Sequence, residues 1–551
     1  MNRMIFQKAV VALIAVVQMA VMTGCVKLAK EDRFQDIKVP QEKLRTIDAI
    51  DLDDMRTEEE PASGEPNEPA EEIELSLQDV RAITLENNLD LKVDLLAPAI
   101  AAEAARAEEA KFESSIYANT TYSKTDRPQA TSVALVGSQV DFVNTNLGVE
   151  IPLRTGGTVT FDLADSYTKT DFTGRAFNPS YENDLTLSVS QPLLRNAGTW
   201  VNMHSIRIAR YDRQIADATT KLNIIKVIAA ADRAYWNLYA ARRVLEVRKE
   251  QYELAQAQLE RARRFVAAGQ NPPVDVIRAE AGLAGQLATI IAAENTLRQQ
   301  QRGLKRMLNK PDLPMASPTV IAPATDPDPV HFQLDAGKLT QSAIDNRMEL
   351  LELELQIVRN LSTIDFMKNQ ALPLLTLNYN YIVHGLGESR GDSFDIMGEK
   401  NFEDHQVRLG LNVPLGNERA MSYLRQAIYT RRQQLATRQS RISLVREEVL
   451  NALDQLETSW QRILANRQSA ILDGRLYEAE QRQYELNMRT STEVLEAQTR
   501  HSDSKSAEYQ ALADYQISLV NLAEATGTLL GAAKIEWEPA VPDISPVSAA
   551  K

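Results

Sequence analysis

The sequence predicts an α+β protein built from two structural repeats, in which each repeat combines short amphipathic strands with a long helical hairpin. Three observations support this fold class: an internal repeat, two very long helical patterns, and segments in which apolar and polar residues alternate. The chain has 551 residues, of which 25% are charged and 6% are aromatic. This composition is typical of elongated helices rather than of several compact cores, so length alone does not set the number of domains.

The internal repeat aligns the first half of the chain with the second. Asn87 aligns with Asn346, and Trp236 aligns with Trp460, within stretches of similar pattern. Between the halves lies a segment rich in proline, which ends a helix rather than continuing it. Three consecutive segments are therefore predicted, a first repeat, a connector and a second repeat, at residues 75–310, 311–331 and 332–531.

Each half contains a long segment whose apolar residues recur in steps of three and four. This is the 3.5-residue period of a supercoiled helix. No proline interrupts residues 197–268, so that helix would extend for roughly 100 Å at 1.5 Å per residue. Such a rod needs neighbours in its own chain or in other copies. The stripes are Ile208, Tyr211, Ile215, Ala218, Leu222, Ile225 and Ala229, and then Ile442, Val445, Val449, Leu453, Leu456, Trp460 and Ile463.

Strands are predicted within residues 116–192 and 374–414, where polarity alternates with a period of two. One side of the second segment carries Leu375, Leu377, Tyr379, Tyr381 and Val383, and the other carries Thr376, Asn378 and Asn380. About 9–11 such residues suffice for a tilted strand to cross hydrocarbon, although an ordinary half-buried sheet produces the same alternation. Pro192 and Pro414 are expected at the strand-to-helix junctions, where a missing N–H is tolerated.

The first half holds an additional pair of alternating segments. Leu147, Val149 and Ile151 precede a glycine-containing turn at residues 154–157, and the alternation resumes at Val159, Phe161 and Leu163. This pattern predicts an extra β-hairpin. The hairpin either joins the other strands, which gives six strands per chain, or forms an extension beyond them, and the first arrangement is slightly favoured.

The N-terminus has the layout of a lipoprotein signal peptide at residues 1–24. Arg3 and Lys8 flank an apolar run that is too short to span a bilayer. The chain's one cysteine, Cys25, follows in Met-Thr-Gly-Cys, which resembles the lipobox of bacterial lipoproteins, whose cysteine is acylated, for example with palmitate. A soluble exported protein with an unrelated cysteine is the alternative. Residues 25–74 and 532–551 are expected to form an acidic disordered tether and a C-terminal tail.

Charge and motif content argue against several functions. A net charge of −14 and a pI near 5.1 disfavour nucleic acid as a partner. A single cysteine excludes an internal disulfide and a zinc site built from cysteines. The five histidines lack the spacing of metal-ligand motifs. We therefore expect no enzyme activity, no cofactor and no metal.

A polar break separates the two long helical patterns of the second half. It spans residues 484–498 and has a weaker copy at residues 265–280. A helix that starts near Thr492 would present Glu493 and Glu496 on one side, because they are three residues apart. A solvated, charged helix end is the simplest interpretation of these residues by themselves.

The break reads Tyr484-x4-Arg-Thr-x2-Glu-Val-Leu-Glu-Ala-Gln, and with the paired strands and paired long helices it resembles the TolC-type outer-membrane efflux proteins, or outer membrane factors. The lipobox is similar to that of their lipoprotein branch. The resemblance covers residues 75–531. It implies a trimeric transmembrane β-barrel, with four strands per protomer in the family, continuous with a long periplasmic α-helical barrel.

The resemblance also implies a function and a location. It implies the outer-membrane channel of a tripartite efflux or type I secretion system: a homotrimeric, passive, gated exit duct. Its partners would be a periplasmic adaptor (membrane fusion) protein, an inner-membrane RND, ABC or MFS transporter, and outer-membrane lipid. The chain would lie in the outer membrane of a Gram-negative-type bacterium, lipid-anchored, and would extend into the periplasm. The alternative is a lipid-anchored periplasmic coiled-coil structural or interaction protein without a pore.

By the same resemblance, the two breaks form the periplasmic gate. Three copies of Glu493 and Glu496 would form acidic rings that favour cations and raise their own pKa values. The links that hold the gate shut would involve Tyr484 and Arg489, with Asp275 as the partner of Arg489. Asn487 stands where the family has glycine, and asparagine tolerates the left-handed conformation. Residues 272–273 are both proline and should stiffen the first tip.

Overall fold

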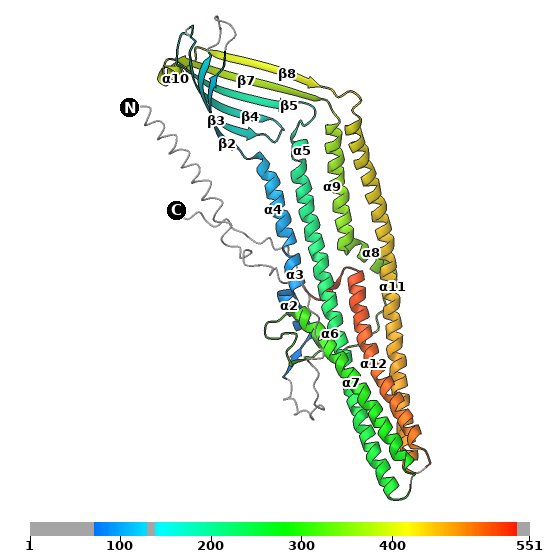
Figure 1. Cartoon of the computed structure of the whole chain (residues 1–551). Coiled ribbons are helices and arrows are strands. Elements are labelled where there is room, and N and C mark those ends of the chain that lie inside the picture. Colours follow the sequence, from blue (N-terminus) through cyan, green and yellow to red (C-terminus); the bar gives the residue numbers. More distant parts are fainter. Residues whose placement is uncertain (1–70, 129–137, 173, 271, 487, 537–551) are drawn as a thin grey trace. The chain divides into compact units, whose positions relative to one another are not determined.

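Each repeat runs from short helices through strands to a long helical hairpin, as Figure 1 shows for the computed structural model. The first repeat has an additional pair of strands, and the second has a helix between its strands. The structure describes residues 71–128, 138–172, 174–270, 272–486 and 488–536, and the signal peptide, Cys25 and Asn487 lie outside them. The helices of the first repeat are α2 (Leu77–Asn87), α3 (Leu89–Asp94), α4 (Ala97–Glu109), η3 (Ala110–Phe112), α5 (Thr199–Asn202), α6 (His204–Ala267) and α7 (Val274–Leu308). Those of the second are α8 (Ala336–Asn346), α9 (Met348–Gln370), α10 (Arg390–Glu399), α11 (Glu418–Glu485), α12 (Ser491–Ala525) and α13 (Leu529–Ala532).

The aligned asparagines occupy equivalent places in the two repeats. Asn87 ends α2 and Asn346 ends α8, and each Nδ2 donates a hydrogen bond to a carbonyl one turn earlier, at 3.3 and 2.9 Å. The repeat seen in the sequence is therefore a repeat of structure.

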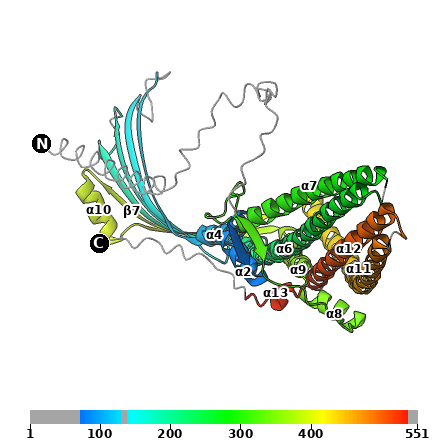
Figure 2. The same cartoon turned by 90° about the horizontal axis from the view of Figure 1, so that it is seen from below.

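The long helices pair into two hairpins, α6–α7 and α11–α12, which lie side by side in Figure 2. The predicted apolar stripes face inward in part: Ala218, Ile225 and Ala229 of α6 and Val445, Val449, Leu456 and Ile463 of α11 are buried. The hairpins are joined across α6 and α12 by an ion pair between Arg233 and Glu524 at 2.7 Å. The predicted supercoiled helices are thus present, and packing against each other buries their stripes.

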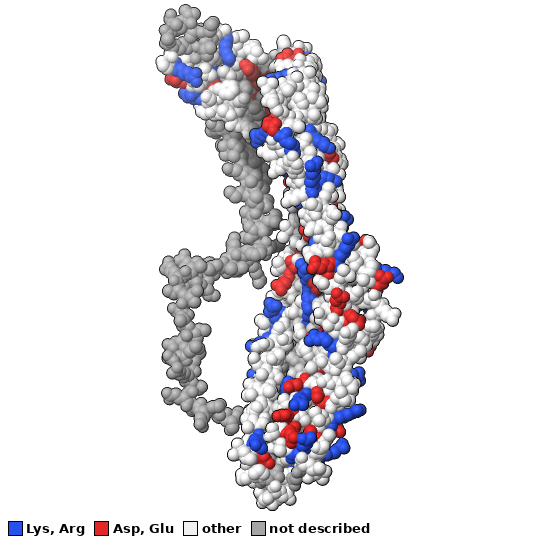
Figure 3. Space-filling model, turned by 90° about the vertical axis from the view of Figure 1, so that its right-hand side faces the viewer, with Lys and Arg blue, Asp and Glu red and all other residues white. Residues whose placement is uncertain are grey.

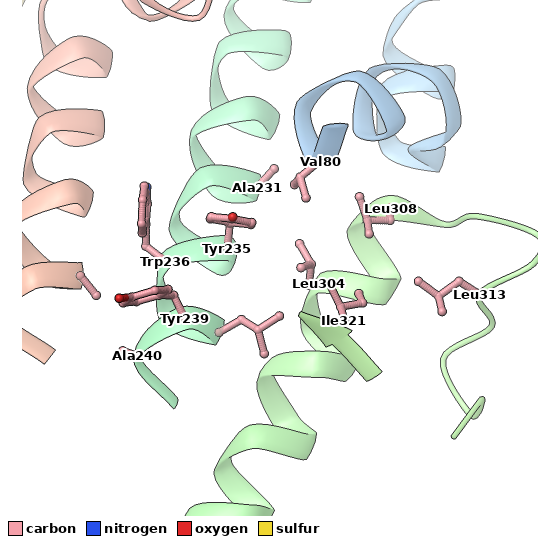
Figure 4. Packing of buried hydrophobic residues seen from close by; sticks show 12 residues of the cluster. Val80, Ala231, Tyr235, Trp236, Tyr239, Ala240, Leu304, Leu308, Leu313 and Ile321 are labelled. Carbon is pink, nitrogen blue, oxygen red and sulfur yellow. The ribbon is translucent and has the colours of Figure 1, made fainter. Parts of the chain in front are cut away.

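One hydrophobic cluster packs α2 against the middle of the first hairpin. Figure 4 shows Val80 of α2, Tyr235 of α6, Leu304 of α7 and Ile321 of β6 within it. Beside the cluster, Arg81 forms a two-pronged ion pair with the fully buried carboxylate of Asp232, at 2.8 and 2.7 Å. Such a pair suits a buried acid because each oxygen receives a donor. The middle of the rods therefore has a well-packed core.

The prediction of a disordered tether up to residue 74 is wrong at its end. Residues 72–75 form strand β1 (Glu72–Leu75), which pairs in parallel with β6 (Val320–Pro323) in the proline-rich connector. The cause is a short alternation, because Ile73 and Leu75 pack against the cluster of Val80 while the intervening Glu74 is exposed. An alternation over only four residues, within an acidic stretch, is too short to be recognised as a strand from the sequence.

All other described strands form one antiparallel sheet in the order β2-β3-β4-β5-β7-β8. The inner pair β5–β7 joins the two repeats, with Leu187 opposite Tyr381. The extra hairpin, β3–β4, lies between β2 and β5 and turns at Gly156, whose φ of +91° suits glycine. The hairpin thus joins the other strands, as favoured, and the described sheet of one chain has six strands. The bounds are Ser115–Asp126, Gln139–Pro152, Thr158–Thr170, Ser180–Pro192, Leu374–Gly387 and Glu403–Asn412.

The register gives the sheet two chemically different faces. In one row Ile116, Val149, Phe161, Leu187, Tyr381 and His405 are consecutive partners across the sheet, and in an adjacent row the partners are Ser115, Glu150, Thr160, Ser188, Asn380 and Gln406. Because side chains alternate between faces, the first row belongs to an apolar face and the second to a polar face. Leu147, Phe161 and Leu185 of the apolar face are more than 40% exposed in the single chain.

Helix α10 was not predicted from the sequence. It connects β7 to β8 and begins with a capping box between Ser389 and Asp392, which is the sequence signal that could have revealed it. The helix packs on the apolar face at the far ends of β5 and β7, and Arg390 pairs with Asp165 of β4 at 3.0 Å. Gly385 allows this close approach, since a Cβ there would lie 2.1 Å from the carbonyl oxygen of Ser393.

Replacement of Gly385 by alanine should dislodge α10. The added methyl group overlaps backbone atoms of the helix, so we expect severalfold faster proteolysis of the β7–β8 connection. Gly398→Ala is the matched control, because a Cβ at Gly398 in the same helix meets open space. Equal cleavage rates in the two variants would contradict this packing.

Candidate functional site

The two hairpin tips lie at the opposite end of the helices from the sheet (Figure 1). Both contain the residues that the sequence singled out, together with partners that it did not. In the first tip, Gly269 adopts a φ of +69°, and the N–H of Gln270 donates to the carbonyl of Phe265 at 2.9 Å. This glycine-ended helix is a Schellman motif, and α7 starts directly after Pro273. The tip therefore turns without any need for a long loop.

In the second tip, Glu493 is part of the cap of α12. Its carboxylate accepts hydrogen bonds from the backbone N–H and the hydroxyl of Thr490, at 2.8 and 3.1 Å, in a capping box. The Thr490 N–H, with help from Arg489, lowers the pKa of Glu493. Within one chain this is opposite to the increase expected for an acidic ring, because local donors favour the charged carboxylate.

Arg489 links the two helices of the second hairpin, α11 and α12, through its side chain. Its Nη1 donates to Glu493 of α12 at 2.6 Å, its Nε donates to Gln483 of α11 at 2.9 Å, and Glu480 of α11 lies 3.2 Å from the same Nε. These contacts hold the end of α11 against the start of α12. The sequence indicated the charge of Arg489 but not its partners Glu480 and Gln483, which lie two turns earlier.

Asp275 and Arg489 belong to different ion pairs within one chain. Asp275 pairs with Arg278 at 3.3 Å in the first turn of α7, where its side chain is largely buried. The other predicted gate acid, Glu496, pairs with Arg500 one turn later, at 3.7 Å. A pair between Asp275 and Arg489 would thus have to form between chains, and it stays a prediction.

Tyr484 joins the two tips. It is 1% exposed, and its ring centroid lies 6.0 Å from that of Phe265, the residue at the start of the first break. Next to this contact, Arg261 of α6 pairs with Glu485 of α11 at 2.9 Å. The sequence predicted a role for Tyr484 but missed Phe265 and Arg261. Their signal was the repeat itself, because the residue aligned with Tyr484 is also aromatic.

The strand-to-helix junctions are held by side-chain amides. Pro192 is the last residue of β5, as expected, whereas Pro414 lies two residues beyond the end of β8 and so follows its strand instead of ending it. Asn369 accepts from the N–H of Asn196 at 2.8 Å and donates to the carbonyl of Leu194 at 3.1 Å. Asn417 donates to the carbonyl of Ala371 at 2.7 Å. These bonds fix where each helix leaves the sheet.

The outer surface carries both signs of charge. On the face in Figure 3, Lys and Arg are interspersed with Asp and Glu along the helices and form no basic patch. Within the described ranges, no group of three or more His, Cys, Asp or Glu side chains is placed to hold a metal ion. One described helix, α7, is long and apolar enough to cross a membrane by composition alone, but it packs along α6 as half of a hairpin.

Comparisons with known proteins identify the family. A family model described as "Outer membrane efflux protein" matches residues 158–310 and 339–528, one match in each repeat. Outer membrane protein TolC of Vibrio cholerae serotype O1 is 23% identical over 356 residues, which cover 63% of this chain and 78% of that protein.

Solved structures show the same fold. The outer-membrane channel OprN is 15% identical with a TM-score of 0.61, over 82% of this chain and 90% of that one. A membrane protein from Pseudomonas aeruginosa is 18% identical with a TM-score of 0.62, over 82% and 93%. The Campylobacter jejuni CmeC outer membrane channel is 14% identical with a TM-score of 0.61, over 82% and 86%.

The chain belongs to the outer membrane efflux protein family, since the family model matches more than half of it. Its fold is that of the family, with barrel strands and a long helical part built from two repeats. Membership makes the chain a channel component and not an enzyme. The tip residues therefore sit in a channel protein, at the end remote from the strands.

Loss of the tip contacts should change the conductance of the channel. We expect Arg489→Ala to raise single-channel conductance in planar bilayers severalfold, because it removes the braces to Glu480 and Glu493. Glu493→Gln should raise it as well, since glutamine retains the capping box but loses the charge. Arg482→Ala is the control, because among the described residues Arg482 pairs within α11 alone, with Glu478. Wild-type conductance and ion selectivity in both tip variants would refute a gating role.

Proposed function

We propose that three copies of this chain form a passive, gated exit duct across the outer membrane that extends into the periplasm. The observation that carries this proposal is the separation of two features in one unit: an amphipathic sheet at one end of continuous helices, and a braced, charged tip at the other. An apolar face suits lipid and a polar face suits a water-filled lumen. Family membership supports a channel in the outer membrane.

Exposed apolar residues on the helices support assembly with further copies. Ile277, Leu287 and Ile291 of α7 are 64, 47 and 60% exposed, and most of this apolar helix is uncovered in the single chain. On α11, Leu450, Leu464 and Ile471 are similarly exposed and repeat at multiples of seven residues. A heptad stripe of this kind is stable when another helix covers it. A closed ring of hairpins from three copies supplies that cover.

We further infer that the duct works with a periplasmic adaptor protein and an inner-membrane transporter of the RND, ABC or MFS type. The chain contains no nucleotide-binding motif, so a passive duct needs energy from elsewhere. The gate in this proposal comprises Tyr484, Arg489, Glu493, Glu496 and Asp275. Its local braces lie within each chain, and opening would separate the tips of neighbouring copies.

The proposal is tested by reconstitution of the full-length protein. We expect purified protein to run as a trimer and to give discrete, cation-preferring channels in planar bilayers. A periplasmic coiled coil without a pore would give no channels, and that result would refute the duct. Chemical cross-linking in native membranes followed by mass spectrometry should recover an adaptor and a transporter, and the transporter class would indicate the cargo.

A lipid anchor at Cys25 is a separate part of the proposal. The Met-Thr-Gly-Cys sequence supports it, although this residue lies outside the described part of the chain. We expect radiolabelled palmitate to be incorporated into the wild-type protein and not into Cys25→Ser. Because barrel strands would hold the chain in the membrane by themselves, the variant should remain in the membrane fraction. Equal labelling of both proteins would rule out acylation at this residue.

A further inference from the structure

We propose that β2 of one copy pairs with β8 of the next, so that three copies close a barrel of 18 strands, six from each. The exit would then be wider than the barrel of a trimer with four strands per copy. This inference rests on the proposed trimer and its membrane location. It adds the seam between copies, the strand number and the size class of solute that the exit admits.

The two edge strands of the described sheet have unpaired sides. β2 and β8 each have a single neighbour in the sheet. Ile116 of β2 is 77% exposed, and Val407 and Leu409 of β8 are 71 and 64% exposed. An exposed apolar edge is a template for pairing with another strand. In hydrocarbon an open edge is not tolerated at all, because no water is present to satisfy its N–H and C=O groups.

The directions of the two edge strands, β2 and β8, are compatible with pairing. Every neighbouring pair in the six-stranded sheet is antiparallel, so β2 and β8 run in opposite directions. A β8 strand that meets β2 of another copy therefore continues the antiparallel pattern. Ile116 and His405 end the same apolar row, and Ser115 and Gln406 end the same polar row. The joined sheet can keep one apolar and one polar face throughout.

Helix α10 indicates which face contacts lipid. It packs on Gly385, and Val383 on the same face is only 2% exposed, so the uncovered apolar part of β7 runs from Leu375 to Tyr381. The step from Leu375 to the first covered residue, Val383, is about 26 Å along the strand and about 20 Å along the barrel axis at a tilt of about 40°. This length fits within the apolar band of outer-membrane barrels, which is about 25 Å tall and contacts lipid. The apolar face therefore points outward, and the polar face lines the lumen.

The number of strands in the closed barrel then sets the diameter of that barrel. One chain with six strands falls below the smallest known barrels, which have eight, so closure requires further copies. With strands about 4.8 Å apart and tilted by about 40°, 18 strands give a backbone diameter of roughly 36 Å, and 12 strands give roughly 24 Å. Barrels of 16–18 strands leave an aqueous channel.

The side chains of the polar face do not fill this width. Across the middle of the sheet they are mostly short and polar, as at Thr160, Thr186, Ser188, Asn378 and Asn380. Short side chains leave most of the backbone diameter free. The exit therefore suits bulky hydrated solutes, and the extra hairpin β3–β4 is the element that widens it.

Cysteine cross-linking tests the seam in the full-length trimer. Gln406→Cys in β8 is combined in turn with Asn119→Cys, Thr121→Cys and Ser123→Cys in β2, all on the polar face. We expect at least one combination to give a covalent trimer on non-reducing gels. Gln406→Cys with Thr160→Cys is the matched control, because β4 has both neighbours within its own chain. If the protein remains a trimer but none of the three combinations gives a covalent trimer, the proposed pairing of β2 with β8 is wrong.

A variant without the extra hairpin tests the width. Replacement of residues 124–179 by Asn-Gly joins β2 to β5 where Ser123 and Ser180 share a row, which leaves four strands. Asn380→Cys is introduced into both the six-stranded and the four-stranded chain. Each protein is then treated from the extracellular side with maleimide-carrying polymers of graded size. We expect the largest polymer that reacts to be more than about 1.5-fold wider for the six-stranded chain, because side chains of similar thickness narrow both barrels by the same amount. The same polymer size limit in the six-stranded and the four-stranded protein would show that β3–β4 does not widen the barrel.

Electron cryomicroscopy of the unmodified trimer decides the strand number independently of any variant. A count of 18 strands supports the proposal. A 12-stranded barrel with β3–β4 outside it would refute the inference and leave the duct function intact. The absence of channels in bilayers would refute the duct itself, so the two failures are distinguishable.

Discussion

The arrangement of this protein follows from one constraint: each backbone N–H and C=O in hydrocarbon needs a partner, and an unpaired group costs several kcal/mol. The single chain meets this constraint for the inner strands of its six-stranded sheet and leaves β2 and β8 as edges. The alternation that separates apolar from polar rows is the side-chain counterpart of the same demand. In the proposed trimer, closure of the ring would meet the same demand at β2 and β8.

The long helices connect the sheet rigidly to the hairpin tips. α6 and α11 are each continuous from near the junction to the tip, so no hinge separates the two ends. Asn369 and Asn417 fix the angle at the junction, and the core beside the buried Asp232 fixes the middle. In the proposed gate, movement of the tips would therefore involve bending or rotation of whole hairpins against each other.

The tips combine helix capping with charge. Glu493 caps α12 and also receives Arg489, so its carboxylate has a structural task within the chain before it has one in a ring. Local donors lower its pKa, whereas equivalent carboxylates from other copies would raise it. In the proposed trimer, the balance between these opposing effects would set how strongly the aperture is charged. Variants that keep the cap and remove the charge separate the two tasks.

The sequence by itself determined the repeat, the long helices, the strand faces and the place of the tips, because these depend on local periodicity and composition. It also located Tyr484, Arg489 and Glu493. Only the tertiary structure decided the partners, since Arg489 reaches Glu480, Tyr484 reaches Phe265, and Asp275 stays with Arg278. It likewise placed β3–β4 inside the sheet and revealed β1 and α10. Short elements and long-range contacts leave little periodic signal, because their stability comes from what packs against them.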